Sequence, residues 1–198
     1  RTTRKGGNEI YIVNQHNAPN VLLEIGRLRE VTFRASGGGT GQSYDLDEFD
    51  TNETCYQQLI VWSPEEEEIV GGYRFILCGD ALVNGELKLS TTHYFDFNAN
   101  FIEKYIPYTI ELGRSWVQPL FQPSVDPRKG LFALDNIWDG LGALIVRYPN
   151  MKYFFGKVTM YSTFNVDARN YLLNFLNHHF PDREQLLKPL QPLPLALN

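Results

Sequence analysis

The chain has 198 residues, of which 43% are hydrophobic, 14% aromatic and 21% charged. This length and balance fit a single globular domain with a packed core and exclude a disordered chain. The net charge of −5 provides no overall positive field, so duplex DNA or RNA is not an expected partner.

The predicted elements follow one another as a helix, several strands, a helix, a strand and a final helix. Pro19 and the apolar spacing after it predict a helix over 18–34, which ends at a glycine-rich loop over 37–41. Helical spacing also predicts helices over 134–147 and 167–179. Runs of strand-forming residues predict strands over 56–63, 69–78, 86–92, 108–117 and 153–160.

This order of elements predicts one mixed α/β domain over 1–183. Short hairpins join the early strands, so the central sheet is expected to be largely antiparallel, with helices on both faces. A tail rich in proline and leucine over 184–198 cannot form a regular helix, and we expect it to lead into a further C-terminal part.

The location of the protein is predicted from what its sequence does not contain. No apolar stretch reaches the roughly 18 to 20 residues that a membrane-spanning helix needs. Cys55 and Cys78 show no metal-ligand spacing, and the histidines have no companion ligands, so no metal site is expected. A reducing cytoplasm is the simpler location, with peripheral contact at the inner membrane as an alternative.

Four short motifs carry a family resemblance. In chain order they are Arg29-x-x-x-Phe33, Asp47-Glu48-Phe49-Asp50, Gly71-Gly72-Tyr73-Arg74 and Glu111-Leu112-Gly113-Arg114. Together they resemble the acyl-homoserine-lactone synthase and ornithine-lipid N-acyltransferase branch of the GNAT superfamily. That branch includes hemolysin-like bacterial proteins and the glycine N-acyltransferases that make acylated glycine lipids. The resemblance covers roughly 22–155 and implies a GNAT-like fold.

The resemblance also implies a polar cluster around the acceptor amine and the acyl thioester. Its members would be Arg29, Asp47, Asp50, Arg74, Glu111 and Arg114. Phe33 shares a helix face with Arg29 and is expected in the core in any case. Trp138 could form a wall of the acyl tunnel, although aromatic residues at helical spacing are also typical of plain core.

The chemistry of amide formation assigns roles within the Glu111 to Arg114 motif. The amine must lose a proton before it attacks, and Glu111 is the first candidate base. A cation such as Arg114, or a backbone N–H aimed by Gly113, could stabilise the oxyanion. In a regular strand Glu111 and Arg114 would face opposite ways and only one would line the site, whereas a bulge at Leu112 or Gly113 would bring both to one side. The alternative for Arg114 is a structural ion pair with Asp50.

The donor is predicted from a missing loop. The pyrophosphate-binding loop typical of the superfamily is absent after the Glu111 strand, where only Arg128-Lys129-Gly130 occurs. Branches that take acyl groups from acyl carrier protein also lack a good copy of this loop. We therefore expect an acyl-phosphopantetheine thioester on the acidic acyl carrier protein as donor substrate, docked by Arg128 and Lys129, with acyl-CoA as the alternative. No permanently bound cofactor is expected.

These features predict an N-acyltransferase that acts in aminolipid biosynthesis. Its acceptor is expected to be a small amino acid, glycine or ornithine, whose carboxylate Arg29 and Arg74 would hold. The open loop over 37–41 favours glycine, because it supplies no acidic pocket for a distal ammonium. Two alternatives stay open: a non-enzymatic module that binds acyl chains or a membrane surface, and a lactone-type signal synthase.

Overall fold

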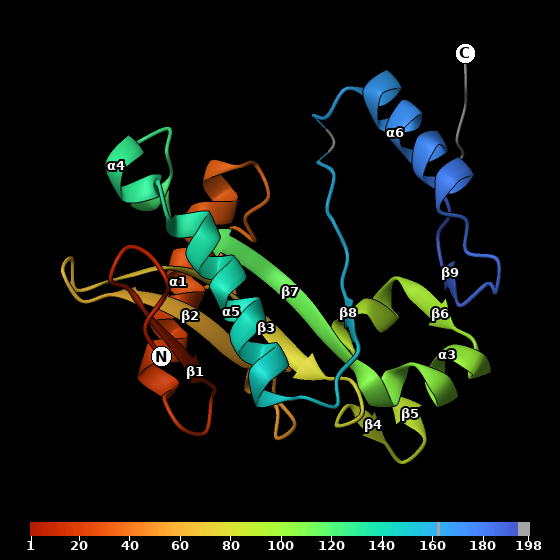
Figure 1. Ribbon diagram of the computed structural model, residues 1–198. Coiled ribbons are helices and arrows are strands. Elements are labelled where there is room, and N and C mark those ends of the chain that lie inside the picture. Colours follow the sequence, from red (N-terminus) through yellow and green to blue (C-terminus); the bar gives the residue numbers. More distant parts are fainter. Residues whose placement is uncertain (162, 194–198) are drawn as a thin grey trace.

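A five-stranded sheet forms the centre of the computed structural model, which describes residues 1–161 and 163–193 (Figure 1). The strand order is β1-β2-β3-β7-β8, antiparallel except for the last pair, β7 and β8, which is parallel. The strands are β1 (Glu9–Val13), β2 (Gln57–Ser63), β3 (Glu68–Leu77), β7 (Thr109–Val117) and β8 (Tyr153–Phe155). The predicted mixed, largely antiparallel sheet is thus confirmed.

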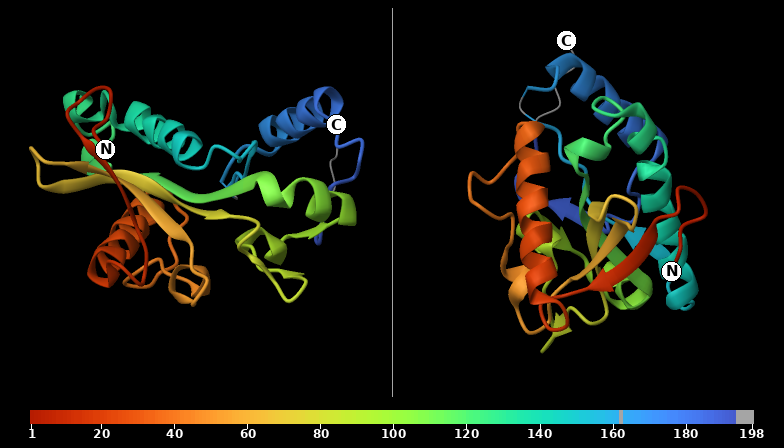
Figure 2. Two further views of the ribbon diagram at one scale, coloured as in Figure 1. Left: turned by 60° about the horizontal axis from the view of Figure 1, so that its bottom comes forward. Right: turned by 90° about the vertical axis from the view of Figure 1, so that its left-hand side faces the viewer.

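One long helix covers each face of this sheet. Helix α1 (Pro19–Ala35) lies on one face and α5 (Ala133–Arg147) on the other (Figure 2). On the α5 face, Leu59, Tyr73, Phe75 and Ile110 form the largest apolar cluster. On the α1 face, residues of the helix pack against alternating strand residues such as Ile60 and Trp116. Successive side chains of β2 and β3 point to opposite faces, and both strands are buried along most of their length because each face is covered.

Small elements extend the end of the sheet that carries β8. Beside β3 and β7 lie β4 (Leu82–Val83), β5 (Glu86–Leu87), the 3₁₀ turns η1 (Ser90–His93) and η2 (Ile106–Tyr108), α3 (Ala99–Lys104), and the paired β6 (Phe95–Phe97) and β9 (Leu187–Pro189). A second apolar cluster, which includes Tyr56, Cys78 and Leu89, holds them against the sheet. The short helix α2 (Glu48–Thr51) and the turn η1 come together over the α1 face at this end, where the site lies.

The structure corrects two of the predicted strands. Within 86–92 only Glu86 and Leu87 are extended, and a 3₁₀ turn follows. The Thr92 hydroxyl donates to the Leu89 carbonyl at 2.7 Å, a local bond that competes with strand pairing. The strand predicted over 153–160 ends at Phe155, because the chain leaves β7 after Gly156.

Several elements were not predicted at all. These are β1, β4, the short helices α2, α3 and α4 (Pro127–Gly130), the turns η2 and η3 (Pro119–Phe121) and the β6–β9 pair. Each is either two turns or fewer in length or paired with a distant segment, so local periodicity carries little signal for it.

The last helix, α6 (Val166–His179), stands apart from the central sheet (Figures 1 and 2). Of the tail predicted over 184–198, residues 187–189 form β9, while 194–198 lie outside the described residues. Among the described residues, no helix combines the length and apolarity needed to cross a membrane.

Candidate active site

A bulge in β7 brings Glu111 and Arg114 to the same side of the sheet. Opposite β3 the register shifts by one residue between Gly113 and Trp116, and Arg114 has a positive φ of 49°. The extra residue reverses the alternation of side chains, so the strand is not regular here. Its position differs from the predicted one, however, because the irregular residue is Arg114 and not Leu112 or Gly113.

The double glycine of the third motif allows β3 to sit closely between its neighbours. A Cβ at Gly72 would lie 2.2 Å from the Leu59 carbonyl oxygen, and one at Gly71 would lie 2.4 Å from the Trp116 carbonyl oxygen. No side chain fits at either position. This close packing of the three strands helps to fix the register in which Arg74, two residues after Gly72, lies opposite Gly113 in the bulged strand.

A cavity of about 560 Å³ opens beside this bulge. Its wall includes Asp47, Arg74, Gly113, Glu111 and Arg114, together with Phe33. Residues 157–159 form another part of the wall, where the chain has parted from β7. Two further cavities, of about 600 and 590 Å³, are not lined by Glu111, Arg74 or Arg114. The first cavity is therefore the candidate active site.

Glu111 is held in this cavity by two hydroxyl groups. Tyr56 donates to Oε2 at 2.7 Å and Ser90 donates to Oε1 at 2.9 Å, while the Ser90 N–H donates to the Tyr56 hydroxyl at 2.9 Å. Burial raises the pKa of Glu111 above its ordinary value, although these hydrogen bonds and the charge of Arg74 oppose that rise. A carboxylate with a raised pKa is a stronger base than an exposed one.

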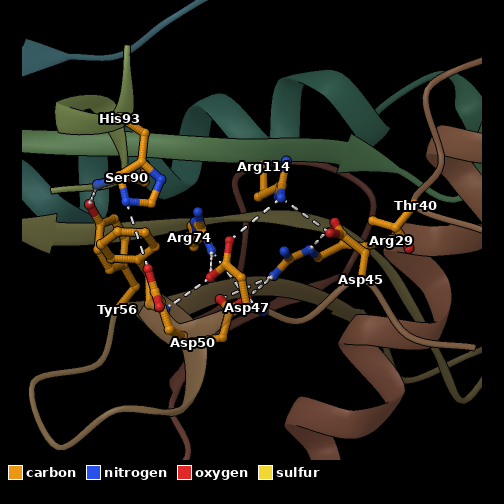
Figure 3. A network of polar contacts seen from close by, with 12 residues as sticks. Arg29, Thr40, Asp45, Asp47, Asp50, Tyr56, Arg74, Ser90, His93 and Arg114 are labelled. Atoms are coloured by element: carbon orange, nitrogen blue, oxygen red, sulfur yellow. Dashed lines mark hydrogen bonds and ion pairs between the residues drawn. The ribbon is translucent and has the colours of Figure 1, made fainter. Parts of the chain in front are cut away.

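Asp50 is the centre of the polar network beside Glu111 (Figure 3). This fully buried carboxylate accepts from Arg29 at 3.2 Å, Arg74 at 3.1 Å and Gln58 at 2.9 Å. Burial alone would raise its pKa, but the two guanidinium groups outweigh burial and hold the pKa below its ordinary value. Asp50 is therefore ionised and fixes both arginines.

Arg114 does not pair with Asp50, so the alternative ion pair considered from the sequence is wrong. Its Nη2 lies 3.3 Å from Asp45 and 3.5 Å from Asp47 (Figure 3). Asp47 also accepts from Arg74 at 2.6 Å and caps α2 by accepting from the Phe49 N–H. The four charged motifs thus meet through shared carboxylates, as the resemblance implied.

The glycine-rich loop over 37–41 lies at the cavity and is anchored to α1. Buried Glu30 accepts from the Thr40 N–H at 2.8 Å, the Thr40 hydroxyl at 2.6 Å and the Gly41 N–H at 3.0 Å. Gly38 lines the cavity, and a Cβ there would lie 2.2 Å from the ring of Tyr161. A larger residue at Gly38 would therefore require the Tyr161 ring to move.

Some residues predicted from the sequence lie away from the cavity wall. Arg29 is fully buried, with Nε 3.0 Å from Asp45 and Nη1 on Asp50, and it does not line the cavity, so its predicted contact with a substrate carboxylate stays a prediction. Trp138 is 63% exposed on α5, on the opposite face of the sheet. Lys129 on α4 pairs with Glu66 at 2.5 Å, and Arg128 is its neighbour. Substrate or carrier binding by Trp138, Arg128 and Lys129 stays a prediction.

Sequence reasoning missed four partners of the site: Asp45, Tyr56, Gln58 and Ser90. Asp45 had a usable signal, because three aspartates fall within six residues at 45, 47 and 50. The other three are single uncharged residues in separate segments, and only the folded chain brings them to Glu111 or Asp50.

The fold agrees with a comparison to known families. Residues 28–126, half of the chain, match the acetyltransferase (GNAT) domain, and the chain belongs to that family. Within this span lie the four motifs, the bulged strand and the arginine–aspartate network. No solved structure gives a significant match.

Two curated relatives are similar over almost the whole chain. The chain is 57% identical over 195 residues to a glycine N(alpha)-acyltransferase of Bacteroides thetaiotaomicron. It is 53% identical over 196 residues to a protein of the same name from Phocaeicola vulgatus. Each match covers 98% of this chain but only 58% and 60% of the respective relative. The chain therefore spans less than two thirds of the length of these relatives.

Proposed function

We propose that the protein is an N-acyltransferase that moves a fatty acyl group, including a 3-hydroxy acyl group, from a carrier thioester to the amine of glycine. The product would be an N-acyl amino acid for aminolipid biosynthesis. The observation that carries this proposal is Glu111, a carboxylate with raised pKa that faces a cavity shared with Arg74 and Arg114. The name of the two relatives supports glycine as the acceptor.

The geometry supports a direct transfer without a covalent enzyme intermediate. Glu111 accepts a proton from the acceptor ammonium, directly or through water, and the free amine attacks the thioester carbonyl carbon. Negative charge moves to the carbonyl oxygen, near the guanidinium groups of Arg74 and Arg114. Collapse of this intermediate restores the carbonyl, breaks the C–S bond and releases the thiolate, which takes up the second proton as the former amine nitrogen loses it to become the neutral amide. Glu111 and Arg114 can act together because the bulge places them on one side.

The acceptor is tested by a competition assay with the full-length protein. Glycine, ornithine, glycinamide and ethanolamine are offered together with one acyl donor, and the amides are quantified by mass spectrometry. We expect acyl glycine to dominate by about tenfold or more over glycinamide, because loss of one charge-assisted hydrogen bond has an effect of this size. Equal acylation of glycinamide or ethanolamine would show that no carboxylate is recognised.

The donor is tested separately, with acyl-carrier thioester and acyl-CoA as the two alternatives. We expect acyl-carrier thioester to be used at least about tenfold more efficiently than acyl-CoA, and Arg128→Glu to remove most of that preference by reversing a docking charge. Raising the salt concentration should also reduce the preference for the carrier thioester, because salt screens the docking charges. Arg147→Glu, at the C-terminal end of α5 and away from α4, is the matched control. Equal use of both donors by the unaltered protein would contradict carrier dependence.

A further inference from the structure

We propose that Lys157 and Tyr94 form a subsite that binds the carboxylate of the acceptor amino acid. This inference rests on the proposed function and names the residues that would recognise the acceptor. Both residues line the cavity that contains Glu111, and neither belongs to the four sequence motifs. The Lys157 ammonium lies 3.8 Å from the centroid of the Tyr94 ring.

The subsite follows first from how the other cations of the cavity are used. Arg74 is paired with Asp47 and Asp50, and Arg114 with Asp45 and Asp47. Lys157 contacts the face of an aromatic ring, and within residues 1–161 and 163–193 it forms no ion pair with a carboxylate. A cation held over a ring keeps its N–H donors for a further partner. An anionic group entering the cavity would meet Lys157 as an uncompensated charge.

The position of Tyr94 connects this cation to the base. Ser90, which donates to Glu111, begins the turn η1, and Tyr94 directly follows the turn with its N–H on the Thr91 carbonyl at 2.9 Å. At the rise of a 3₁₀ helix, the backbone of Tyr94 lies about 8 Å along the turn from that of Ser90. One rigid turn therefore holds a hydroxyl on the carboxylate base and an aromatic ring under the cation.

The chemistry of the two substrates favours a carboxylate as the bound anion. In an α-amino acid a single carbon separates the amine from the carboxylate, so an anion site must lie close to the base that accepts the proton from the amine. The phosphate of a phosphopantetheine donor lies at the far end of its arm from the thioester. Either the acceptor carboxylate or the donor phosphate could bind a lysine. Only the carboxylate is held by covalent structure close to the amine, and therefore close to Glu111.

The test compares Lys157 with Lys152, a second lysine whose ammonium lies over a tyrosine ring. Lys157→Met should raise the KM for glycine by about tenfold and leave kcat nearly unchanged, because it removes a binding contact that is equal in ground and transition states. It should also reduce the preference for glycine over glycinamide, and Lys157→Arg should restore most of it. Lys152→Met is the control, because Lys152 lies 4.4 Å from the Tyr108 ring but does not line the cavity.

The remaining outcomes decide between the sources of the anion. A raised KM for the acyl donor with an unchanged KM for glycine would assign Lys157 to the donor phosphate and overturn the carboxylate subsite. Equal effects of Lys157→Met and Lys152→Met would also overturn it. Titration of carboxyl-labelled glycine by NMR, with no donor present, separates this inference from the proposed function. Glycine binding that depends on Lys157 without any amide formation would contradict the function alone.

Discussion

Replacement of Glu111 by glutamine is expected to lower kcat about 100-fold with little change in the KM for glycine. The isosteric amide keeps the contacts to Tyr56 and Ser90, because both hydroxyls can turn to donate or accept. It cannot take a proton from the acceptor, and general base catalysis contributes roughly 10² to 10⁴ to the rate. Steady-state kinetics of amide formation, with far-UV circular dichroism to confirm folding, measures the effect.

The pH profile distinguishes loss of the base from a general disturbance of the site. The pKa of Glu111 lies above its ordinary value because the side chain is buried, so kcat should fall as the pH falls through that raised pKa. In Glu111→Gln this acidic limb should disappear, and only the deprotonation of the acceptor's own ammonium should remain. An acidic limb of unchanged position in the variant would show that another group is the base.

The sequence predicted those parts of the site whose residues are charged and grouped in motifs. The pairing of Arg29, Arg74 and Arg114 with nearby aspartates joins segments from α1, the loop before α2, β3 and β7. Electrostatics requires buried arginines to find carboxylates, so the cluster was predictable without knowing which pairs form. The exact partners depended on the bulge at Arg114, whose position no local pattern reveals.

Residues whose roles depend on a distant neighbour could not be predicted. Lys157 lies in a segment that reads as a strand, and its contact with Tyr94 exists only because the chain leaves β7 after Gly156. Arg29 is the opposite case, since its motif suggested a residue at the substrate, whereas in the folded chain its side chain is fully buried against Asp45 and Asp50. Local propensity does not distinguish these outcomes, because burial is decided by tertiary packing.

The most destabilising single change in the site is expected at Asp50. Asp50→Asn should lower the free energy of unfolding at pH 7 by about 3 kcal/mol, because it leaves the buried guanidinium groups of Arg29 and Arg74 short of negative charge. Urea unfolding followed by circular dichroism measures this loss. Glu24→Gln is the control, since it removes an exposed ion pair to Arg27 and should cost less than about 1 kcal/mol.

The pH dependence and a second substitution show whether charge is the cause. The folded-state pKa of Asp50 is depressed, so its contribution is fully present above the pKa of an unfolded aspartate, about 3.9, and is lost as the pH falls through the folded pKa. The stability difference should therefore be constant from about pH 8 to 5 and shrink below about pH 4. Adding Arg29→Met to Asp50→Asn should cost less than the sum of the two single changes, because the unpaired buried charge is then gone. Additive losses would mean that packing around Asp50, and not its charge, holds the network in place.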